Sequence, residues 1–504
     1  MSDQGSGRSD SAIDRLLMTL ACAAVLYVVA MATVYGVYPG YLDHGEPIVA
    51  AAAFRMLDGA PVYPSFDGSN FTSNVYGPYN YLANGLVMAV FGGGSLTGKL
   101  AGLVATLVAV LAVWAAYRQH GKRTLALTLL LACGFLLLMV PYSIWNRPDP
   151  FLLAVAALAV LAVRRPSSGG RWVSWIVVGV LGGIACGLKL YGPLFIAPAG
   201  VYLALRDRSI LSVFVMSAAG IATVMLPFAL PVFPLENYIG WFGIVAEKPT
   251  DAGMAFKAFR YGIFFLLPAA VLLTWCFVDA PGSKAAVRKP ETGYAGTALL
   301  GMLLCGYVAA KPGAGMYYLL PFAPLAIDMT VRLMDAVTPR FSRPAAVFAV
   351  ALAVAMSVVA VPVQKRLFRA LEWDRTQAIR DDLQRIVSEY PGRTIQMAVG
   401  SSIAGYHNTL QKTELVYAGN PYTVDFGIMA ETSFLGIELS DALIRTIVRC
   451  DTDIWLVPKG ETPLTLTGYY GNPVVDQEFR DAFKAAYEKT GASAYFDLWE
   501  CSTR

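Results

Sequence analysis

Apolar runs long enough to cross a lipid bilayer recur along most of this chain. A helix needs about 20 apolar residues to span about 30 Å of hydrocarbon, and fewer where it packs inside a bundle. Only 15% of the residues are charged and 56% are apolar. A soluble chain would carry about a quarter charged residues. The sequence therefore predicts a polytopic α-helical membrane protein.

The runs can be assigned individually, with one ambiguity. The segment 76–91 is also moderately apolar, but it holds a proline and two asparagines. Because each crossing reverses the direction of the chain, this segment decides the orientation of all later helices. We expect about eleven spanning helices, over residues 16–38, 97–117, 124–141, 151–163, 172–189, 191–205, 209–230, 258–278, 294–310, 315–332 and 345–363.

The placement of lysine and arginine decides between the two orientations. If 76–91 does not cross, the loops on the cytoplasmic side hold 14 of these residues, and the opposite loops hold six over far more residues. Cytoplasmic loops of membrane proteins carry an excess of Lys and Arg. We therefore interpret 76–91 as an interfacial helix on the outer face.

This topology divides the chain into three parts. Residues 1–15 form a disordered cytoplasmic tail, residues 16–363 form a transmembrane domain, and residues 364–504 form an extracytoplasmic α/β domain. The transmembrane domain carries two long outer loops, over 39–96 and 231–257. The first loop and the C-terminal domain are thus expected on the same side of the membrane.

Local patterns support an α/β fold for the C-terminal domain. Periodicity predicts two helices, over 374–390 and 439–449, and two strands, over 394–399 and 454–457. The domain also holds Cys450 and Cys501, whereas the other five cysteines lie within apolar runs. In an oxidising compartment the two form a disulfide, and otherwise they are two free thiols.

The first outer loop carries an acidic motif directly after the first apolar run. Asp43 and Glu46 are three residues apart, so they share one face if a helix begins here. A carboxylate held beside aromatic residues at the membrane surface is partly desolvated, which raises its pKa and suits a general base. The alternative is a structural cap, in which Asp43 closes the start of a helix that includes Ile48 to Leu57. His44, a lone imidazole between them, is not expected to be a ligand.

Basic residues at the outer ends of the spans form a second signal. They are Lys99, Arg147, Lys189, Arg260 and Lys311. Ionisable groups near hydrocarbon are costly and are usually paired or functional. A ring of such cations would bind a lipid phosphate. The alternatives are snorkelling to the headgroups for Lys99 and Arg260, and a local ion pair between Arg147 and Asp149. Lys189 follows an uninterrupted apolar run and fits neither alternative.

Taken together, these segments resemble the polyprenyl-phosphate-sugar-dependent membrane glycosyltransferases of the GT-C fold. That group includes the protein O-mannosyltransferases and the aminoarabinose transferases of lipid A. The resemblance covers roughly residues 16–330. It rests on Asp43-His44-Gly45-Glu46, Leu57-Asp58-Gly59, Val62-Tyr63, Tyr76-Gly77-Pro78-Tyr79-Asn80-Tyr81, Gly98-Lys99-Leu100, Arg147-Pro148-Asp149, Lys189, Lys311-Pro312-Gly313-Ala314 and Tyr317-Tyr318. The chain departs from the family in having Lys99 where Arg is usual, which keeps the charge but loses the bidentate fork.

The resemblance implies an inverting transfer of a sugar from a polyprenyl-phosphate donor to a hydroxyl of a cell-envelope glycan, glycolipid or protein. Asp43 would accept the proton of the attacking hydroxyl, and Glu46 would position the acceptor or share a divalent cation, Mg or Mn, with Asp43. Lys189 and Arg147 would stabilise charge on the departing phosphate. The further substrate-binding residues implied are Tyr76, Tyr79, Lys99, Asp149, Tyr191, Lys311 and Tyr317.

The resemblance also implies a plasma-membrane enzyme with its N-terminus in the cytoplasm, in contact with the lipid bilayer. The small net charge of +4 does not suggest a nucleic-acid partner. A transporter or flippase is the main alternative. Transporters bind at the midplane between repeated halves, whereas here the ionisable residues gather at one face and no repeat is visible. An inactive relative that binds lipid-linked glycans is a second alternative.

Overall fold

The computed structural model describes residues 4–73, 76–165, 170–279, 289–336, 342–468 and 471–502. The chain forms two compact units, each assembled from segments that are distant in sequence. Unit 1 comprises Met1–Gly36, Gly102–Leu226 and Thr250–Arg369. Unit 2 comprises Val37–Ala101, Pro227–Pro249 and Ala370–Arg504.

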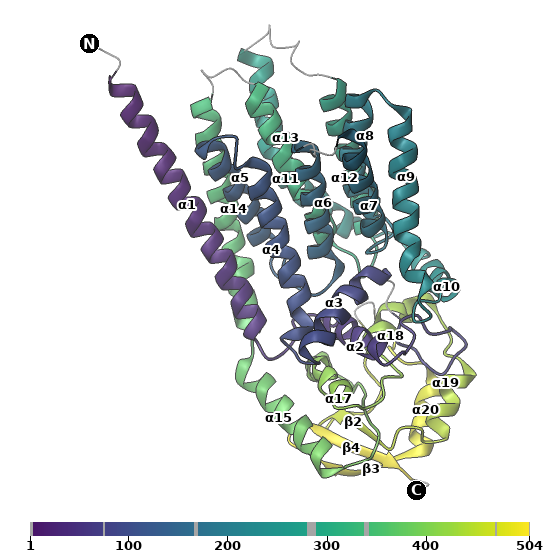
Figure 1. Ribbon diagram of the computed structural model, residues 1–504. Helices are drawn as coiled ribbons and strands as arrows, with labels where there is room; N and C mark the ends of the chain where they lie inside the picture. The colour runs from purple at the N-terminus through teal and green to yellow at the C-terminus, as the bar shows by residue number, and fades with distance from the viewer. Residues whose placement is uncertain are drawn as a thin grey trace. The chain divides into compact units, whose positions relative to one another are not determined.

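Unit 1 is a set of long apolar helices that run beside one another (Figure 1). They are α1 (Gln4–Val37), α4 (Thr97–Tyr117), α5 (Lys122–Leu138), α6 (Pro148–Arg164), α7 (Arg171–Cys186), α8 (Ala197–Asp207), α9 (Ile210–Met225), α11 (Ala252–Asp279), α12 (Lys289–Ala309), α13 (Ala323–Ala336) and α14 (Ser342–Ala370), with the 3₁₀ helices η1 (Gly192–Phe195) and η4 (Met316–Phe322). Each expected apolar run overlaps these helices, and the runs over 191–205 and 315–332 are each divided between a 3₁₀ helix and an α-helix. The helical fold class is therefore confirmed.

Five helices among the described residues are long and apolar enough to cross a membrane by themselves. They cover Ile13–Val37, Thr97–Tyr117, Ile210–Ala229, Ala252–Thr274 and Lys289–Ala309. The other helices of unit 1 are not among these five, although α14 is 29 residues long. The total of about eleven crossings therefore stays a prediction. Helix α1 extends back to Gln4, into the segment expected to be a disordered tail.

A buried ionic cluster joins α4, α6 and α13 in unit 1. The carboxylate of Asp328 is fully buried and accepts hydrogen bonds from Tyr117 Oη at 2.6 Å, Arg164 Nε at 2.5 Å and Arg332 Nε at 2.8 Å. A buried charge is costly unless it is paired and hydrogen-bonded, and these donors supply both. Two of the cations that were counted as cytoplasmic loop charges thus hold helices together.

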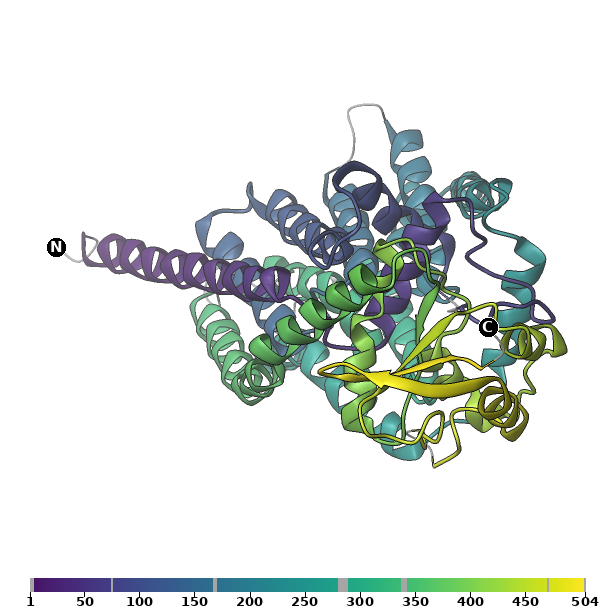
Figure 2. The same cartoon turned by 90° about the horizontal axis from the view of Figure 1, so that it is seen from below.

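Unit 2 combines short helices with a small sheet. Its elements are α2 (Gly45–Leu57), α3 (Pro78–Phe91), α10 (Leu235–Ala246), α15 (Trp373–Glu389), β1 (Ile395–Met397), α16 (Ile403–Asn408), α17 (Thr413–Tyr417), α18 (Phe426–Thr432), α19 (Asp441–Val448), β2 (Ile454–Pro458), α20 (Gln477–Ala486), β3 (Tyr487–Ala492) and β4 (Phe496–Cys501). The strand order is β1-β2-β4-β3, with β1 parallel to β2 and the other pairs antiparallel. Figure 2 shows these strands with α20 beside them.

The elements expected in the C-terminal domain and the helix expected over 76–91 are all present, so the α/β prediction is confirmed. The antiparallel pair β3 and β4 was not predicted. Residues of β3 are mostly exposed and polar, so the strand lacks the alternation of apolar and polar residues that marks a half-buried strand.

One hydrophobic core draws on all three segments of unit 2. Tyr63 and Phe71 from the first loop pack in the same cluster as Trp241 of α10 and Phe426 and Trp455 of the C-terminal segment. Backbone hydrogen bonds reinforce this packing, because Phe71 makes two with the C-terminal segment and Val62 donates one to the carbonyl oxygen of Val232. The first loop and the C-terminal segment therefore fold as one body.

Cys450 and Cys501 are joined by a disulfide, with their Cα atoms 5.8 Å apart. Of the two alternatives left open by the sequence, the bridge is the one observed. It links the end of α19 to the end of β4 and so closes the C-terminal segment on itself.

Replacing both cysteines with serine is expected to lower the free energy of unfolding of unit 2. The two are 51 residues apart in sequence, and the loss of such a cross-link frees about 4 kcal/mol of chain entropy in the unfolded state. Guanidinium unfolding of the full-length protein in detergent, followed by near-ultraviolet circular dichroism, measures the change. Wild type treated with a reductant should match the variant, and equal midpoints for all three samples would contradict the expectation.

Asp382 ties α15 to the turn between β3 and β4. Its carboxylate accepts hydrogen bonds from Ser493 Oγ at 2.6 Å, Arg385 Nη2 at 2.7 Å and Tyr495 N at 3.0 Å. Burial acts to raise the pKa of Asp382, but these hydrogen bonds outweigh it and leave the pKa below its usual value.

An Asp382→Asn variant is expected to be less stable than wild type, by an amount that depends on pH. The pKa of Asp382 is lower in the folded state than in the unfolded state. Its contribution to the free energy of unfolding is therefore full above the usual carboxyl pKa of about 4, and it is lost as the pH falls through the pKa of the folded state. The deficit should therefore be about 1–3 kcal/mol at pH 7 and should shrink below pH 4. Guanidinium midpoints at pH 3 and pH 7 measure it, and an equal deficit at both values would refute this account.

Candidate functional site

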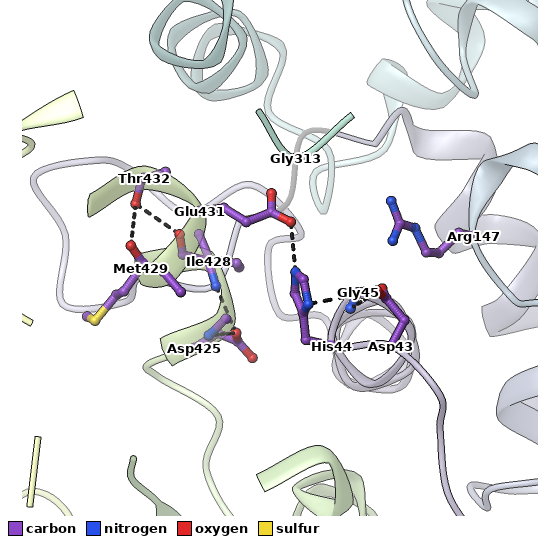
Figure 3. Close-up of polar contacts among 12 residues, drawn as sticks. Asp43, His44, Gly45, Arg147, Gly313, Asp425, Ile428, Met429, Glu431 and Thr432 are labelled. Atoms are coloured by element: carbon purple, nitrogen blue, oxygen red, sulfur yellow. Dashed lines mark hydrogen bonds and ion pairs between the residues drawn. The ribbon is translucent and has the colours of Figure 1, made fainter. Parts of the chain in front are cut away.

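Asp43 lies in the turn that leads into α2, and its two carboxylate oxygens have different surroundings. Oδ1 accepts the backbone N–H of Gly45 at 2.9 Å, at the first residue of the helix. Oδ2 lies 3.9 Å from Nδ1 of His44 (Figure 3). The side chain is 29% exposed. The N-cap position of α2 is His44, so Asp43 holds the turn before the helix through Oδ1 and is not its N-cap.

Glu46 lies in the first turn of α2 and is fully buried. Its Oε2 accepts the backbone N–H groups of Leu42 at 2.8 Å and Asp43 at 3.1 Å. These bonds hold the turn that carries Asp43. The catalytic role expected for Glu46 stays a prediction, and the observed contacts give it a role in shaping the loop.

The first-loop carboxylates do not fit a divalent cation. Two of their oxygens are already hydrogen-bonded to backbone amides, and a hard cation would need them as ligands. Across the described parts of the chain, no cluster of three or more His, Cys, Asp or Glu residues is arranged to hold a metal ion. We therefore derive no step that passes through a metal.

Lys99, at the start of α4, is fully buried within unit 2. Its Nζ donates to the carbonyl oxygen of Tyr38 at 2.5 Å and lies 5.3 and 5.5 Å from the ring centres of Tyr38 and Tyr41. The snorkelling alternative for Lys99 was wrong, because a snorkelling ammonium reaches water and this one is enclosed. The contact with a donor phosphate expected for Lys99 stays a prediction.

Unit 1 holds a buried cluster of two cations and one carboxylate. Lys189 Nζ donates to Oδ1 of Asp149 at 2.8 Å, and Trp145 Nε1 donates to Oδ2 of the same residue at 3.1 Å. Arg147 is the residue immediately before α6, and its Nη2 donates to Tyr317 Oη at 2.8 Å. Asp149 is thus paired with Lys189, 40 residues along the chain, and the local pair expected between Arg147 and Asp149 stays a prediction. With two cations and one anion, the cluster carries one net positive charge.

Two close backbone contacts, each made at a glycine, fix the position of this cluster. A Cβ on Gly102 of α4 would lie 1.9 Å from the carbonyl oxygen of Trp145, so only glycine lets α4 pack against the segment before Arg147. A Cβ on Gly192 would lie 1.9 Å from the carbonyl oxygen of Ala185, where the chain folds back after Lys189.

Aromatic rings enclose the cationic groups. Lys189 Nζ lies 3.9 Å from the ring centre of Tyr318, and the Arg147 guanidinium carbon lies 4.0 Å from that of Trp145. Tyr191 stacks on Tyr318 at 5.1 Å. The hydroxyl of Tyr191 is buried and finds no hydrogen-bond partner among the described residues. A buried hydroxyl of this kind is suited to donate to an anionic ligand.

Comparison with known proteins identifies the fold. Residues 77–233 match the family model described as dolichyl-phosphate-mannose-protein mannosyltransferase. The crystal structure of ArnT from Cupriavidus metallidurans in the apo state matches with a TM-score of 0.55 and 15% identity, over 95% of this chain and 98% of that chain. The structure of that protein bound to undecaprenyl phosphate matches with a TM-score of 0.56 and 16% identity, over 94% and 97%. This chain has the GT-C fold.

A more distant likeness is to the Archaeoglobus fulgidus oligosaccharyltransferase in the apo form, with a TM-score of 0.49 and 12% identity over 94% of this chain and 74% of that chain. That likeness is too weak to support an inference. No curated protein sequence matches the chain. The resemblance stated from the sequence motifs is thus confirmed at the level of the GT-C fold.

Within this GT-C fold, the residues expected at the site fall into the two units. Unit 1 holds Arg147, Asp149, Lys189, Tyr191, Lys311 and Tyr317, and unit 2 holds Asp43, Glu46, Tyr76, Tyr79 and Lys99. Arg147, Asp149 and Lys189 come together with Tyr191 and Tyr317 as described above. Lys311 follows the end of α12 and is half-buried. Tyr76 is buried, and its carbonyl oxygen accepts the hydroxyl of Tyr63 at 2.6 Å, whereas Tyr79 is half-buried in α3.

Two residues near the first loop were not expected from the sequence: Glu431 of α18, which contacts the loop, and Lys248, which pairs with Glu431. Nε2 of His44 lies 2.8 Å from Oε1 of Glu431, and Glu431 Oε2 lies 3.8 Å from Nζ of Lys248. Nearly 400 residues separate His44 from Glu431, and no local sequence pattern predicts a pairing over that distance. His44 was not expected to be a ligand, and in the structure it is one of the links between the first loop and the C-terminal segment.

Two apolar cavities lie along α11 and α12 in unit 1. One, of about 570 Å³, is lined by residues near the start of α11 and the end of α12, including Phe259 and Tyr307. The other, of about 470 Å³, is lined near the opposite ends of these helices and includes Tyr294 and Arg332. Leu266 and Leu299 line both cavities, so the two are neighbours along the helices.

Replacing Lys189 with methionine is expected to lower the thermal unfolding temperature, because Asp149 would remain buried without its ammonium partner. Removing one member of a buried ion pair typically costs about 3–5 kcal/mol. Adding Asp149→Asn to the same chain should recover part of the loss. Thermal unfolding in detergent measures both variants, with Lys257→Met on the exposed surface of α11 as the control. If Lys189→Met unfolds at the temperature of the control, the pair does not stabilise unit 1.

Proposed function

We propose that this protein is an inverting membrane glycosyltransferase. It transfers a sugar from a polyprenyl-phosphate donor to a hydroxyl of a cell-envelope glycan, glycolipid or protein. The observation that carries the proposal is the GT-C fold, shared over 95% of the chain with ArnT, together with the net-positive cluster of Arg147, Lys189 and Asp149 in unit 1. The structure of ArnT bound to undecaprenyl phosphate supports the choice of donor class.

The donor would be held by unit 1 through two kinds of contact. Its phosphate would bind the cationic groups of Arg147 and Lys189, which together with the buried hydroxyl of Tyr191 are complementary to an anion. Its isoprenoid chain would lie in the apolar cavities along α11 and α12, which bury hydrocarbon at a gain of about 25 cal/mol per Å². A polyprenyl-phosphate donor has a charged head, which matches the cationic cluster, and a long apolar tail, which matches the cavities.

Asp43 would serve as the general base. As the acceptor oxygen forms its bond to the anomeric carbon, its proton passes to the carboxylate, and the bond from that carbon to the phosphate oxygen breaks. The products are the glycosylated acceptor, polyprenyl phosphate and protonated Asp43. Attack from the face opposite the phosphate inverts the anomeric configuration. A phosphate leaves as a stable anion, so this reaction needs one carboxylate where glycoside hydrolysis uses two.

The proposal includes a location. With the excess of lysine and arginine on the cytoplasmic side, unit 2, and with it Asp43, would lie on the outer face of the plasma membrane. The lipid-linked donor would then be used from the outer leaflet. A divalent cation is no part of the proposed mechanism, since the first-loop carboxylates do not fit one.

Asp43→Asn is expected to abolish sugar transfer without unfolding the protein. The amide keeps an oxygen for the Gly45 N–H but cannot accept a proton, and general-base catalysis contributes about 10²–10⁴-fold. Glycolipid and glycan profiling of cells that lack the chain, complemented with wild type or variant, measures the transfer and identifies the sugar. The matched control is Asp58→Asn, an exposed carboxylate at the end of the same helix.

Two outcomes would contradict the proposal. If Asp43→Asn restores the missing sugar as well as wild type does, Asp43 only holds the turn before α2 and the base is elsewhere. If wild-type protein moves a labelled lipid-linked sugar across vesicle membranes in the absence of any acceptor, and transfers none of it when an acceptor is supplied, the protein is a transporter.

A further inference from the structure

Glu431 reaches the first loop from the C-terminal segment. Oε1 of Glu431 lies 2.8 Å from Nε2 of His44, the residue next to Asp43 (Figure 3). An ionised carboxylate only accepts hydrogen bonds, so Nε2 carries the proton and donates it. The other ring nitrogen, Nδ1, then lies 3.9 Å from Oδ2 of Asp43. The imidazole thus stands between the two carboxylates.

Helix α18, which carries Glu431, is fixed at its start by a buried carboxylate. Asp425 caps the helix, accepting the N–H groups of Gly427 at 2.8 Å and Ile428 at 3.1 Å through Oδ1. Its Oδ2 is paired with Lys412 and accepts the hydroxyl of Tyr422 at 2.5 Å. A cap and an ion pair on one buried side chain leave the helix little freedom. Glu431 is therefore presented from a rigid support.

Lys248 engages the second oxygen of Glu431. It lies just after the end of α10, its side chain is 4% exposed, and its Nζ is 3.8 Å from Oε2. The Glu431 side chain itself is 30% exposed and that of His44 15%. The two groups have opposite charges and attract each other at this distance. Glu431 thus has one oxygen turned to His44 and one to Lys248.

We propose that Glu431 is a positioning residue for the transfer reaction, acting through His44 on Asp43. The hydrogen bond to Glu431 sets the rotation of the imidazole, and the imidazole then limits where Oδ2 of Asp43 can lie, while the Gly45 N–H holds Oδ1. The inference rests on the proposed function, in which Asp43 is the base, and it gives the C-terminal segment a part in catalysis. Small displacements of a reacting group are costly, about 100-fold in rate for about 1 Å.

Substitutions of Glu431 can separate a positioning role from other roles, because they change the hydrogen bond to His44 in different ways. A glutamine at position 431 keeps a carbonyl oxygen that accepts the His44 N–H, whereas an alanine removes the acceptor. We expect Glu431→Ala to lower kcat about tenfold or more with an acceptor KM within about twofold of wild type, and Glu431→Gln to retain kcat within about threefold. Glu438→Ala, an exposed residue of the same segment, is the matched control.

A double-mutant cycle tests whether Glu431 acts through His44. Residues that act through one contact have non-additive effects, so Glu431→Ala should cost nothing further in a His44→Ala background. Equal losses of kcat in the two backgrounds would overturn the proposal. So would a rise in acceptor KM at unchanged kcat, which would make Glu431 a binding contact for the acceptor.

Amide hydrogen exchange supplies a readout that does not need activity. In full-length protein in detergent, Glu431→Ala should speed exchange of the amides of residues 42–46, whereas Glu431→Gln and Glu438→Ala should leave it unchanged. Unchanged exchange in Glu431→Ala would overturn the positioning role even if activity fell. If Asp43→Asn proves fully active while exchange responds as expected, the assignment of the base has failed and the contact between Glu431 and the first loop stands.

Discussion

A charge placed inside an apolar helical unit must be compensated by other side chains, because hydrocarbon offers it neither water nor counterions. Unit 1 meets this requirement twice, in different ways. Around Asp328 the carboxylate is matched by two arginines and a tyrosine hydroxyl, all directed at the same group. These hydrogen bonds compensate the buried carboxylate and hold α4, α6 and α13 together.

Around Asp149 the same requirement is met differently. Lys189 and Trp145 donate to the carboxylate, and Arg147 donates to a tyrosine hydroxyl instead. The cations also face aromatic rings, which attract cations through their faces but do not neutralise them. The buried hydroxyl of Tyr191 belongs to the same aromatic group. The two clusters differ in that the donors around Asp328 all point at one carboxylate, whereas those around Asp149 are divided between a carboxylate and a tyrosine hydroxyl.

The long helices of unit 1 could be predicted from the sequence. A membrane-spanning helix appears as a continuous apolar run, and its recognition does not depend on partners that are distant along the chain. The position of Lys189 at the end of such a run gave a local reason to expect a special residue. Two helices and two strands of the C-terminal segment, α15, α19, β1 and β2, also followed from local periodicity, whereas its short helices, α20 and the pair β3 and β4 were not predicted. What the sequence could not show were partners distant along the chain. The pairing of Glu431 with His44, and the shared core of Phe71 with Trp455, exist only after three remote segments have folded together.

The shared core of unit 2 also explains why two similar acids, three residues apart, reach such different environments. The backbone of the first loop turns sharply into α2, and the turn exposes N–H groups that no helix bond satisfies. Glu46, already inside the helix, points back and accepts two of them, so its carboxylate is buried. Asp43, still outside the helix, accepts one N–H through Oδ1, and its side chain stays 29% exposed. A general base must reach its substrate, which a fully buried carboxylate cannot do. The turn therefore gives Asp43, the proposed base, the exposure that this role requires, and leaves Glu46 to support the loop.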